Sequence, residues 1–279
     1  MLNYKRKNKK KVIPGFGISM GITLTLLSII VLIPLSSIVI STSNIEFSKF
    51  VDIITSREVI SAYKVSFFCS FLAALINCVF GVILAWVLVK YDFFGKRFLD
   101  GLIELPFALP TAVAGIALTL LYSDKGLIGK IFSHIGIKIA YTKIGIIIAM
   151  IFIGIPFVVR TIQPVLRKMD KEYEEAAFML GASKIRTFFR VIFPEIFPAM
   201  LAGFGLAFAR GLGEYGSVIF IAGNIPYKTQ ILPLLIMNKL EQFNYPAATA
   251  LALVMLIVSF VLLLLINIIQ SHITKRLFG

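Results

Sequence analysis

The sequence predicts an all-α integral membrane protein with six transmembrane helices. Of its 279 residues, 58% are hydrophobic and only 15% are charged. The hydrophobic residues form long unbroken runs, which the hydrocarbon core of a bilayer accepts and which water does not. Composition and run length together exclude an ordinary soluble domain.

Six apolar runs come close to the length that a helix needs to cross the hydrocarbon, which is about 20 residues. The fourth run is short, so its helix must extend to about Val165 to cross the hydrocarbon. The first run is not a cleavable signal, because its apolar core is too long and no small-residue cleavage pattern follows it. In the second run, Asn77 stands alone among apolar residues and is expected to form an interhelical hydrogen bond. The expected spans are 18–40, 65–89, 102–122, 144–159, 196–221 and 247–269.

The positions of Lys and Arg predict that both chain termini lie in the cytoplasm (N-in/C-in). With that orientation the inner segments hold 18 Lys and Arg residues and the outer segments hold nine, as the positive-inside rule favours. This bias explains most of the net charge of +14. We therefore interpret the basic character as topology and attraction to anionic membrane lipid, rather than as nucleic-acid binding.

The chain carries no recognisable motif for ATP binding, metal binding or covalent catalysis. The segment "GLIGKIF" at Gly126 comes nearest to a phosphate-binding loop, but it lacks the four-residue spacer and the Ser or Thr that holds magnesium. No nucleophile has a base at recognisable spacing. His134 and His272 stand outside any metal-ligand pattern. We expect no catalytic residue, no metal site and no cofactor bound by this chain.

One charged stretch, residues 172–195, interrupts the apolar sequence and reads "EYEEAAFMLGASKIRTFFRVIFPE". Its acids come first and its bases last, which is the order that a helix dipole prefers. Gly181 can adopt a left-handed conformation that ends one short helix, and a second helix is expected to stop near Pro194. The stretch predicts a helix-turn-helix on the cytoplasmic face. An amphipathic loop resting on lipid headgroups is the alternative.

This stretch resembles the EAA loop of ABC importer permeases, whose pattern is Glu-Ala-Ala, three residues, Gly, nine residues, Ile, one residue and Leu-Pro. The matching residues are Glu175, Ala176, Ala177, Gly181 and Pro194, while Val191 and Phe193 replace the Ile and the Leu. The resemblance implies a coupling helix that docks in a groove of a separate ATPase subunit. It also implies the type I importer permease (MetI-like) fold, with ATP and magnesium bound on the partner ATPase.

Two further stretches resemble the sulfate and molybdate branch of these permeases: "ELPFALPTAVAGIAL" from Glu104 and "ARGLGEYGSVIFIAGN" from Ala209. With "AYKVSF" at Ala62 and "FNYPAATALA" at Phe243, they are most similar to the T subunit of sulfate/thiosulfate importers. A molybdate or tungstate permease is the main alternative. The resemblance implies three partners: a related W-type permease subunit, an ATPase dimer and an extracytoplasmic sulfate-binding protein. It also implies a bacterial inner membrane or a plastid membrane.

Arg210 and Glu214 are candidates for lining a translocation path. They lie four residues apart in an apolar run, so they can meet on one helix face, and each costs about 2.5 to 3.5 kcal/mol at the centre of an inserted helix. They therefore need partners or a water-filled cavity, and a purely structural ion pair is the alternative. Pro106, Pro110 and Thr111 open the third expected span. A broken turn there would present unpaired backbone groups to the path, and a simple kink is the alternative.

The resemblance divides the chain into four parts: a basic cytoplasmic N-terminus (1–17), a first transmembrane helix with an outer loop (18–60), a permease core of five transmembrane helices with the coupling loop 172–194 (61–270), and a cytoplasmic tail (271–279). Two other classes of function stay open. An ion-coupled secondary transporter predicts inverted repeats of about three spans, and residues 18–89 and 144–221 show no such repeat. A non-transporting scaffold would leave the charged pair and the coupling loop without a role.

Overall fold

The computed structural model describes the backbone of residues 16–278 and the side chains of that range except those of residues 171 and 274–278. Most of the expected basic N-terminus therefore lies outside the described residues. Regular structure in the described range is helical throughout. In chain order the elements are α1 (Phe16–Leu27), η1 (Ser28–Leu32), α2 (Ile33–Ser43), α3 (Phe47–Thr55), α4 (Arg57–Lys90), α5 (Lys96–Ala108), α6 (Thr111–Tyr122), α7 (Leu127–His134), α8 (Lys143–Lys168), α9 (Lys171–Met179), α10 (Lys184–Thr187), η2 (Phe188–Ile192), α11 (Phe193–Leu212), α12 (Gly216–Ala222), α13 (Leu232–Glu241) and α14 (Tyr245–Phe278).

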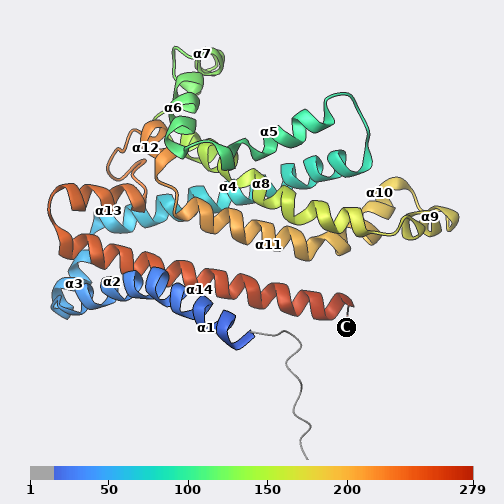
Figure 1. Cartoon of the computed structure of the whole chain (residues 1–279). Coiled ribbons are helices and arrows are strands. Elements are labelled where there is room, and N and C mark those ends of the chain that lie inside the picture. Colours follow the sequence, from blue (N-terminus) through green and yellow to red (C-terminus); the bar gives the residue numbers. More distant parts are fainter. Residues whose placement is uncertain (1–15, 279) are drawn as a thin grey trace, which may run out of the picture.

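The long helices α4, α8, α11 and α14 run side by side, with α9 and α10 at one end and α3 and α13 at the other (Figure 1). In the described part of the chain, five helical stretches are long and apolar enough to cross a membrane. They are Phe16–Ser43, Arg57–Lys90, Lys143–Lys168, Lys184–Leu212 and Tyr245–Ile273. The bent pair α5 and α6 makes a sixth if it counts as one span. The predicted all-α membrane architecture is confirmed, whereas the orientation stays a prediction.

Helices α4, α8 and α11 form the buried centre, and glycines let their backbones approach closely. A Cβ added at Gly81 of α4 would lie 2.6 Å from Val158 Cγ1 of α8, and one at Gly203 of α11 would lie 2.8 Å from Val158 Cα. Such close packing holds helices together in lipid, where burying apolar surface gives little driving force. Around these contacts, Val158 and Ile162 are fully buried.

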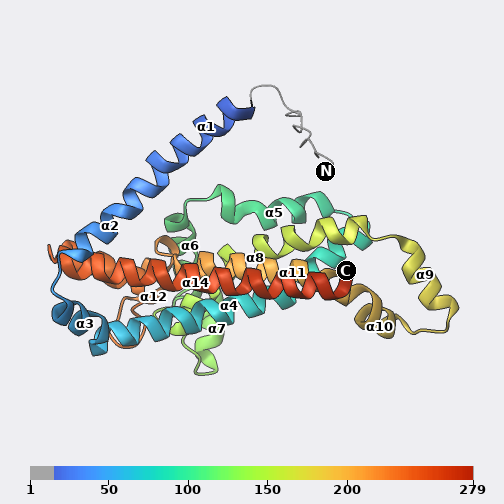
Figure 2. The same cartoon turned by 90° about the horizontal axis from the view of Figure 1, so that it is seen from below.

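The first span packs differently from this centre. No residue of α1 or η1 is buried, and Figure 2 shows α1 diverging from α14. Its exposed side chains are uncharged and mostly apolar, among them Ile18, Ile22 and Ile30. A largely apolar and largely exposed helix of this kind is stable when lipid or another membrane subunit surrounds it.

The third expected span, residues 102–122, is wrong as a continuous helix. Helix α5 ends at Ala108, α6 begins at Thr111, and their axes differ by 114°. The cause is Pro110, which disfavours helical geometry in the preceding residue, and Leu109 is extended with φ −88° and ψ 137°. Pro106 lies buried inside α5 without breaking it. The interruption is therefore a true break at Pro110, and a simple kink is ruled out.

The fourth and fifth expected spans have different boundaries from those predicted. Helix α8 continues to Lys168, so Arg160, one of the 18 Lys and Arg residues assigned to the inner segments, lies within a helix that packs against α5. The fifth expected span, 196–221, is interrupted, because α11 ends at Leu212 and α12 begins at Gly216. Gly211 and Gly213 have poor helix propensity, and they sit where the first of these two helices ends.

Two smaller expectations also fail. Pro194 does not end a helix, because residues 184–212 form one continuous helical stretch. A π-helical turn, η2, precedes Pro194, with the amide of Phe193 bonded to the carbonyl of Phe188, and such turns absorb the bond that a proline removes. Asn77 is completely buried against Gly154, yet its amide nitrogen and oxygen have no hydrogen-bond partner among the described residues.

Candidate functional site: a coupling hairpin and a junction of two broken helices

The first candidate site is a pair of short helices, α9 and α10, which we call the coupling hairpin (171–187). Gly181 adopts φ +75°, so the expected left-handed turn is confirmed. The Gly181 amide donates a hydrogen bond to the Phe178 carbonyl oxygen at 2.9 Å, and the Ala182 amide donates one to the Ala177 carbonyl oxygen at 3.0 Å. These two bonds make a Schellman motif, which satisfies carbonyls at the end of α9.

The tip of the coupling hairpin presents large apolar side chains to its surroundings. Met179, Leu180 and Ile185 are 90%, 88% and 73% exposed. Glu175 and Ala176 are also exposed, and Pro194, at the start of α11, is partly buried. An apolar tip rimmed by charged residues is typical of a surface that another protein or a membrane surface covers.

One ion pair ties the coupling hairpin to the bundle. Lys90, the last residue of α4, pairs with Glu174 of α9, and each side chain is only 20% exposed. The Lys90 ammonium also lies 5.4 Å from the centre of the Trp86 ring, and that ring packs edge-on against Phe188 at 5.5 Å. The orientation of α9 is therefore linked to the C-terminal end of α4.

The second candidate site lies at the break between α11 and α12. Arg210, in the last turn of α11, pairs with Glu214 just beyond it, with 2.5 Å between Nη1 and Oε2. The other carboxylate oxygen accepts hydrogen bonds from the Ser217 amide at 2.8 Å and the Ser217 hydroxyl at 3.0 Å. Glu214 is 1% exposed, whereas Arg210 is 36% exposed. Glu214 thus caps α12 and neutralises one side of Arg210.

Helix α6 meets α12 at this break, and the contact brings Thr111 into the same site. A Cβ at Gly216 would lie 2.2 Å from Thr111 Oγ1, and one at Gly115 would lie 2.4 Å from the carbonyl oxygen of Ser217. We call this contact the α6–α12 junction, defined by Thr111, Gly115, Glu214, Gly216 and Ser217. The first amides of α6 point out of the helix start, beyond reach of its own carbonyls. Pro106 lies in α5 and Pro110 precedes the first residue of α6, and neither proline has a described contact with Arg210.

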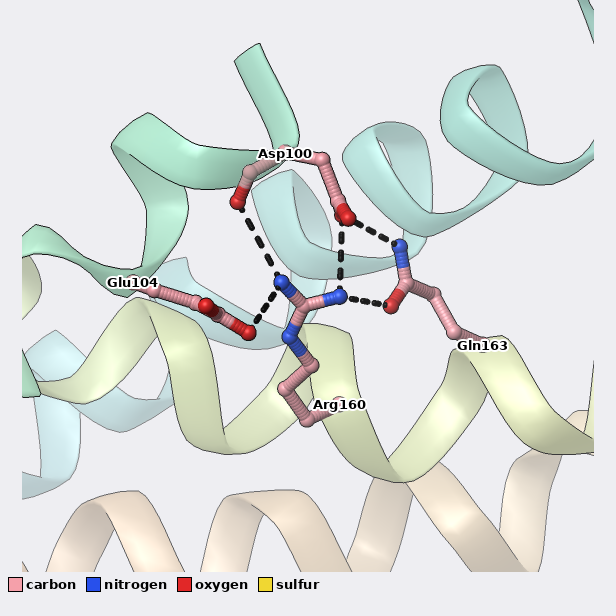
Figure 3. Close-up of polar contacts among 4 residues, drawn as sticks. All are labelled: Asp100, Glu104, Arg160 and Gln163. Atoms are coloured by element: carbon pink, nitrogen blue, oxygen red, sulfur yellow. Dashed lines mark hydrogen bonds and ion pairs between the residues drawn. The ribbon is translucent and has the colours of Figure 1, made fainter. Parts of the chain in front are cut away.

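A third polar cluster, the α5–α8 latch, was missed in the sequence (Figure 3). It consists of Asp100 and Glu104 on α5 with Arg160 and Gln163 on α8. The signal was present, because the two acids are four residues apart and the two partners are three apart, which places each pair on one helix face. The third span was predicted to begin at 102 and the fourth apolar run to end at 159, with its helix extended to about Val165, so all four residues lay near the ends of the predicted spans and were not compared with one another.

Residues 77–279 match the family described as binding-protein-dependent transport system inner membrane component. The chain belongs to this family. The sulfate transport system permease proteins CysT of Salmonella typhimurium and Escherichia coli are 47% and 46% identical to it, each match covering 98% of both chains. The CysT protein of Synechocystis is 44% identical, covering 96% of this chain and 93% of the relative.

Solved structures show the same fold. A chain of a bacterial ABC transporter involved in the import of the acidic polysaccharide alginate superposes with a TM-score of 0.77 at 19% identity, covering 92% of this chain and 95% of the other. A chain of the MetNI methionine ABC transporter gives a TM-score of 0.56 at 14% identity, covering 79% and 96%. The chain is therefore a multi-pass membrane permease with the type I ABC importer fold. Membership of this transport family sets aside the secondary-transporter and scaffold alternatives.

Proposed function

We propose that this chain is a membrane subunit of an ATP-driven importer that carries sulfate into the cell. The observation that carries the proposal is the coupling hairpin, whose exposed apolar tip stands at the end of the bundle expected to face the cytoplasm. The choice of sulfate rests on relatives of nearly equal length whose names describe sulfate permeases. Thiosulfate, a similar dianion, fits the same proposal.

The partners follow from what this chain lacks. Without a phosphate-binding loop it needs ATP and magnesium bound on a separate ATPase, and a groove on that ATPase would receive Glu175, Ala176, Ala177 and Gly181. A second, W-type permease subunit and a second ATPase copy would complete the membrane complex. An extracytoplasmic sulfate-binding protein would deliver the anion. A chain of the same fold comes from an alginate transporter solved in complex with a substrate-bound periplasmic protein.

Arg210 is the residue that we propose contacts the anion. Among the described residues its only ion-pair partner is Glu214, which takes one end of the guanidinium. The remaining N–H groups of Arg210 stay free to donate to a dianion. The partial neutralisation by Glu214 would keep binding weak enough for release. Thr111 and the start of α6, set by Pro106 and Pro110, would add neutral donors beside it.

The test is sulfate uptake into proteoliposomes that hold the complete transporter, with and without ATP, and with molybdate as a competitor. We expect ATP-dependent uptake that Gly181→Val and Glu175→Lys abolish without reducing the amount of permease in the membrane. Gly136→Val is the matched control, because Gly136 also has a positive φ of +76° with open space around it but lies just after α7. Uptake without ATP, or normal uptake by both hairpin variants, would refute the proposal.

A further inference from the structure

The α5–α8 latch adds polar contacts to an interface whose other described contacts are apolar. Helix α5 buries only Ile103 and Pro106 of its 13 residues, and its main helix contact is with α8. Phe107 of α5 also packs edge-on against Phe157 of α8, with ring centres 5.1 Å apart, and hydrophobic burial by itself is not directional. Polar contacts across the same interface fix the register of the two helices.

Arg160 is at the centre of the latch (Figure 3). Its Nη1 donates to Asp100 Oδ1 at 2.9 Å and to Gln163 Oε1 at 2.6 Å, while its Nη2 donates to the carbonyl oxygen of Asp100 at 3.2 Å. Nη2 also pairs with Glu104 Oε1 at 2.6 Å. Gln163, which is 2% exposed, closes the ring by donating from Nε2 to Asp100 Oδ1 at 3.2 Å. A planar guanidinium can serve all these acceptors at once, whereas an ammonium cannot.

The place of the latch in the chain gives it a mechanical consequence. Arg160 lies about two helical turns before the end of α8, and Met169 and Asp170 alone separate that end from the coupling hairpin. On the other side, α5 leads through Leu109 and Pro110 directly into α6, whose first residue meets Gly216 at the α6–α12 junction. A movement of the inner end of α8 would therefore carry α5, and α5 would carry α6.

We propose that Arg160 is a positioning residue for transport: it makes α5 move with α8, so that a displacement of the coupling hairpin reaches the α6–α12 junction. This inference rests on the proposed function, because it needs an ATPase acting on the hairpin. A latch that serves stability alone would change how much complex assembles. A latch that transmits movement changes how much sulfate enters for each ATP hydrolysed.

The experiment measures sulfate uptake and ATP hydrolysis in the same proteoliposomes, reconstituted with the complete transporter, for Arg160→Lys, Asp100→Asn and their double variant. We expect each single variant to lower the sulfate-to-ATP ratio about tenfold, which is the usual scale for a lost hydrogen bond to a charged group. Because both residues act through one contact, the double variant should be no worse than either single one. Glu104→Gln changes a half-exposed side chain and should lower the sulfate-to-ATP ratio less. It still tests the latch if the Arg160→Lys complex does not assemble.

Asp92→Asn is the matched control. It removes an ion pair between Asp92 and Lys96 at the start of α5, and the Asp92 carboxylate is fully exposed. It should leave the ratio unchanged. If the ratio stays at the wild-type value in Asp100→Asn and Glu104→Gln while less complex assembles, the latch is only a structural contact and the inference is wrong. If the wild-type complex itself imports no sulfate with ATP, the proposed function fails instead.

Discussion

The burial difference between Glu214 and Arg210 predicts an asymmetric response to mutation. Arg210→Ala leaves a carboxylate that is 1% exposed without its counter-charge, and breaking a buried pair in this way costs about 3 to 5 kcal/mol. Glu214→Gln keeps an oxygen to accept from Ser217 and leaves only the partly exposed Arg210 unpaired. We expect it to cost about 1 kcal/mol, the usual net loss for one hydrogen-bonded contact.

The double variant Arg210→Ala/Glu214→Gln should be more stable than Arg210→Ala alone, because it removes the uncompensated charge. We expect a recovery of about 2 kcal/mol, within the usual range for groups in direct contact. The assay is thermal unfolding of the purified complex, with Tm compared among the four proteins. If Arg210→Ala is no less stable than Glu214→Gln, Arg210 does not compensate the buried carboxylate and the reasoning fails.

Uptake by the same proteins separates the two roles of the pair. If Arg210 contacts the anion, the double variant should regain stability but not sulfate uptake per assembled complex. If uptake returns together with stability, the pair is structural. The anion path would then have to be sought elsewhere, beginning with the backbone from Pro106 to Thr111.

Three further predictions concern other contacts. Gly115→Val should destabilise the α6–α12 junction by about 1 to 3 kcal/mol through overpacking, because its Cβ would meet the Ser217 carbonyl. Gly101→Val is the control and should not destabilise the protein, since Gly101 has open space around it. Equal Tm values for the two variants would contradict this. Lys90→Glu and Glu174→Lys should each impair uptake and the combined swap should restore it, and a swap as poor as either single variant would exclude the ion pair as the link. Ser183→Cys, in a protein lacking Cys69 and Cys78, should react only with a reagent added from inside, and labelling from outside would overturn the orientation.

Periodicity and length predicted the helices well but not where they break. Apolar runs fix the membrane class because the hydrocarbon selects for them over about 20 residues. Apolar residues continue on both sides of Leu109 and Pro110, and on both sides of Gly213 to Tyr215, so apolar runs alone joined helices that the structure separates. The Pro and Gly residues at these points were visible in the sequence. Their effect was underestimated, because proline and glycine also occur inside intact membrane helices.

The coupling hairpin was predictable because its determinants are local. Gly181 alone specifies the left-handed turn, and the order of acids and bases specifies the helices around it. The latch was not predictable in the same way, because Asp100 and Arg160 are 60 positions apart and only the packing of α5 on α8 brings them together. The end of the second hairpin helix was misjudged for a different reason, since the π-helical turn before Pro194 has no clear sequence signal.

The two interrupted spans meet at their interruptions, and the physics of the bilayer makes this arrangement informative. Each break frees backbone groups that lipid cannot satisfy. Glu214 satisfies the Ser217 amide, and the contact between Gly115 and Ser217 brings the two backbones together, yet the first amides of α6 and most of the Arg210 guanidinium need a further polar partner. Water, another subunit or an anion would each supply such a partner in the assembled transporter, whereas the hydrocarbon of lipid would not. The breaks place Glu214, Gly216 and Thr111 at one junction, and this shared position is what supports the proposed path for a charged substrate.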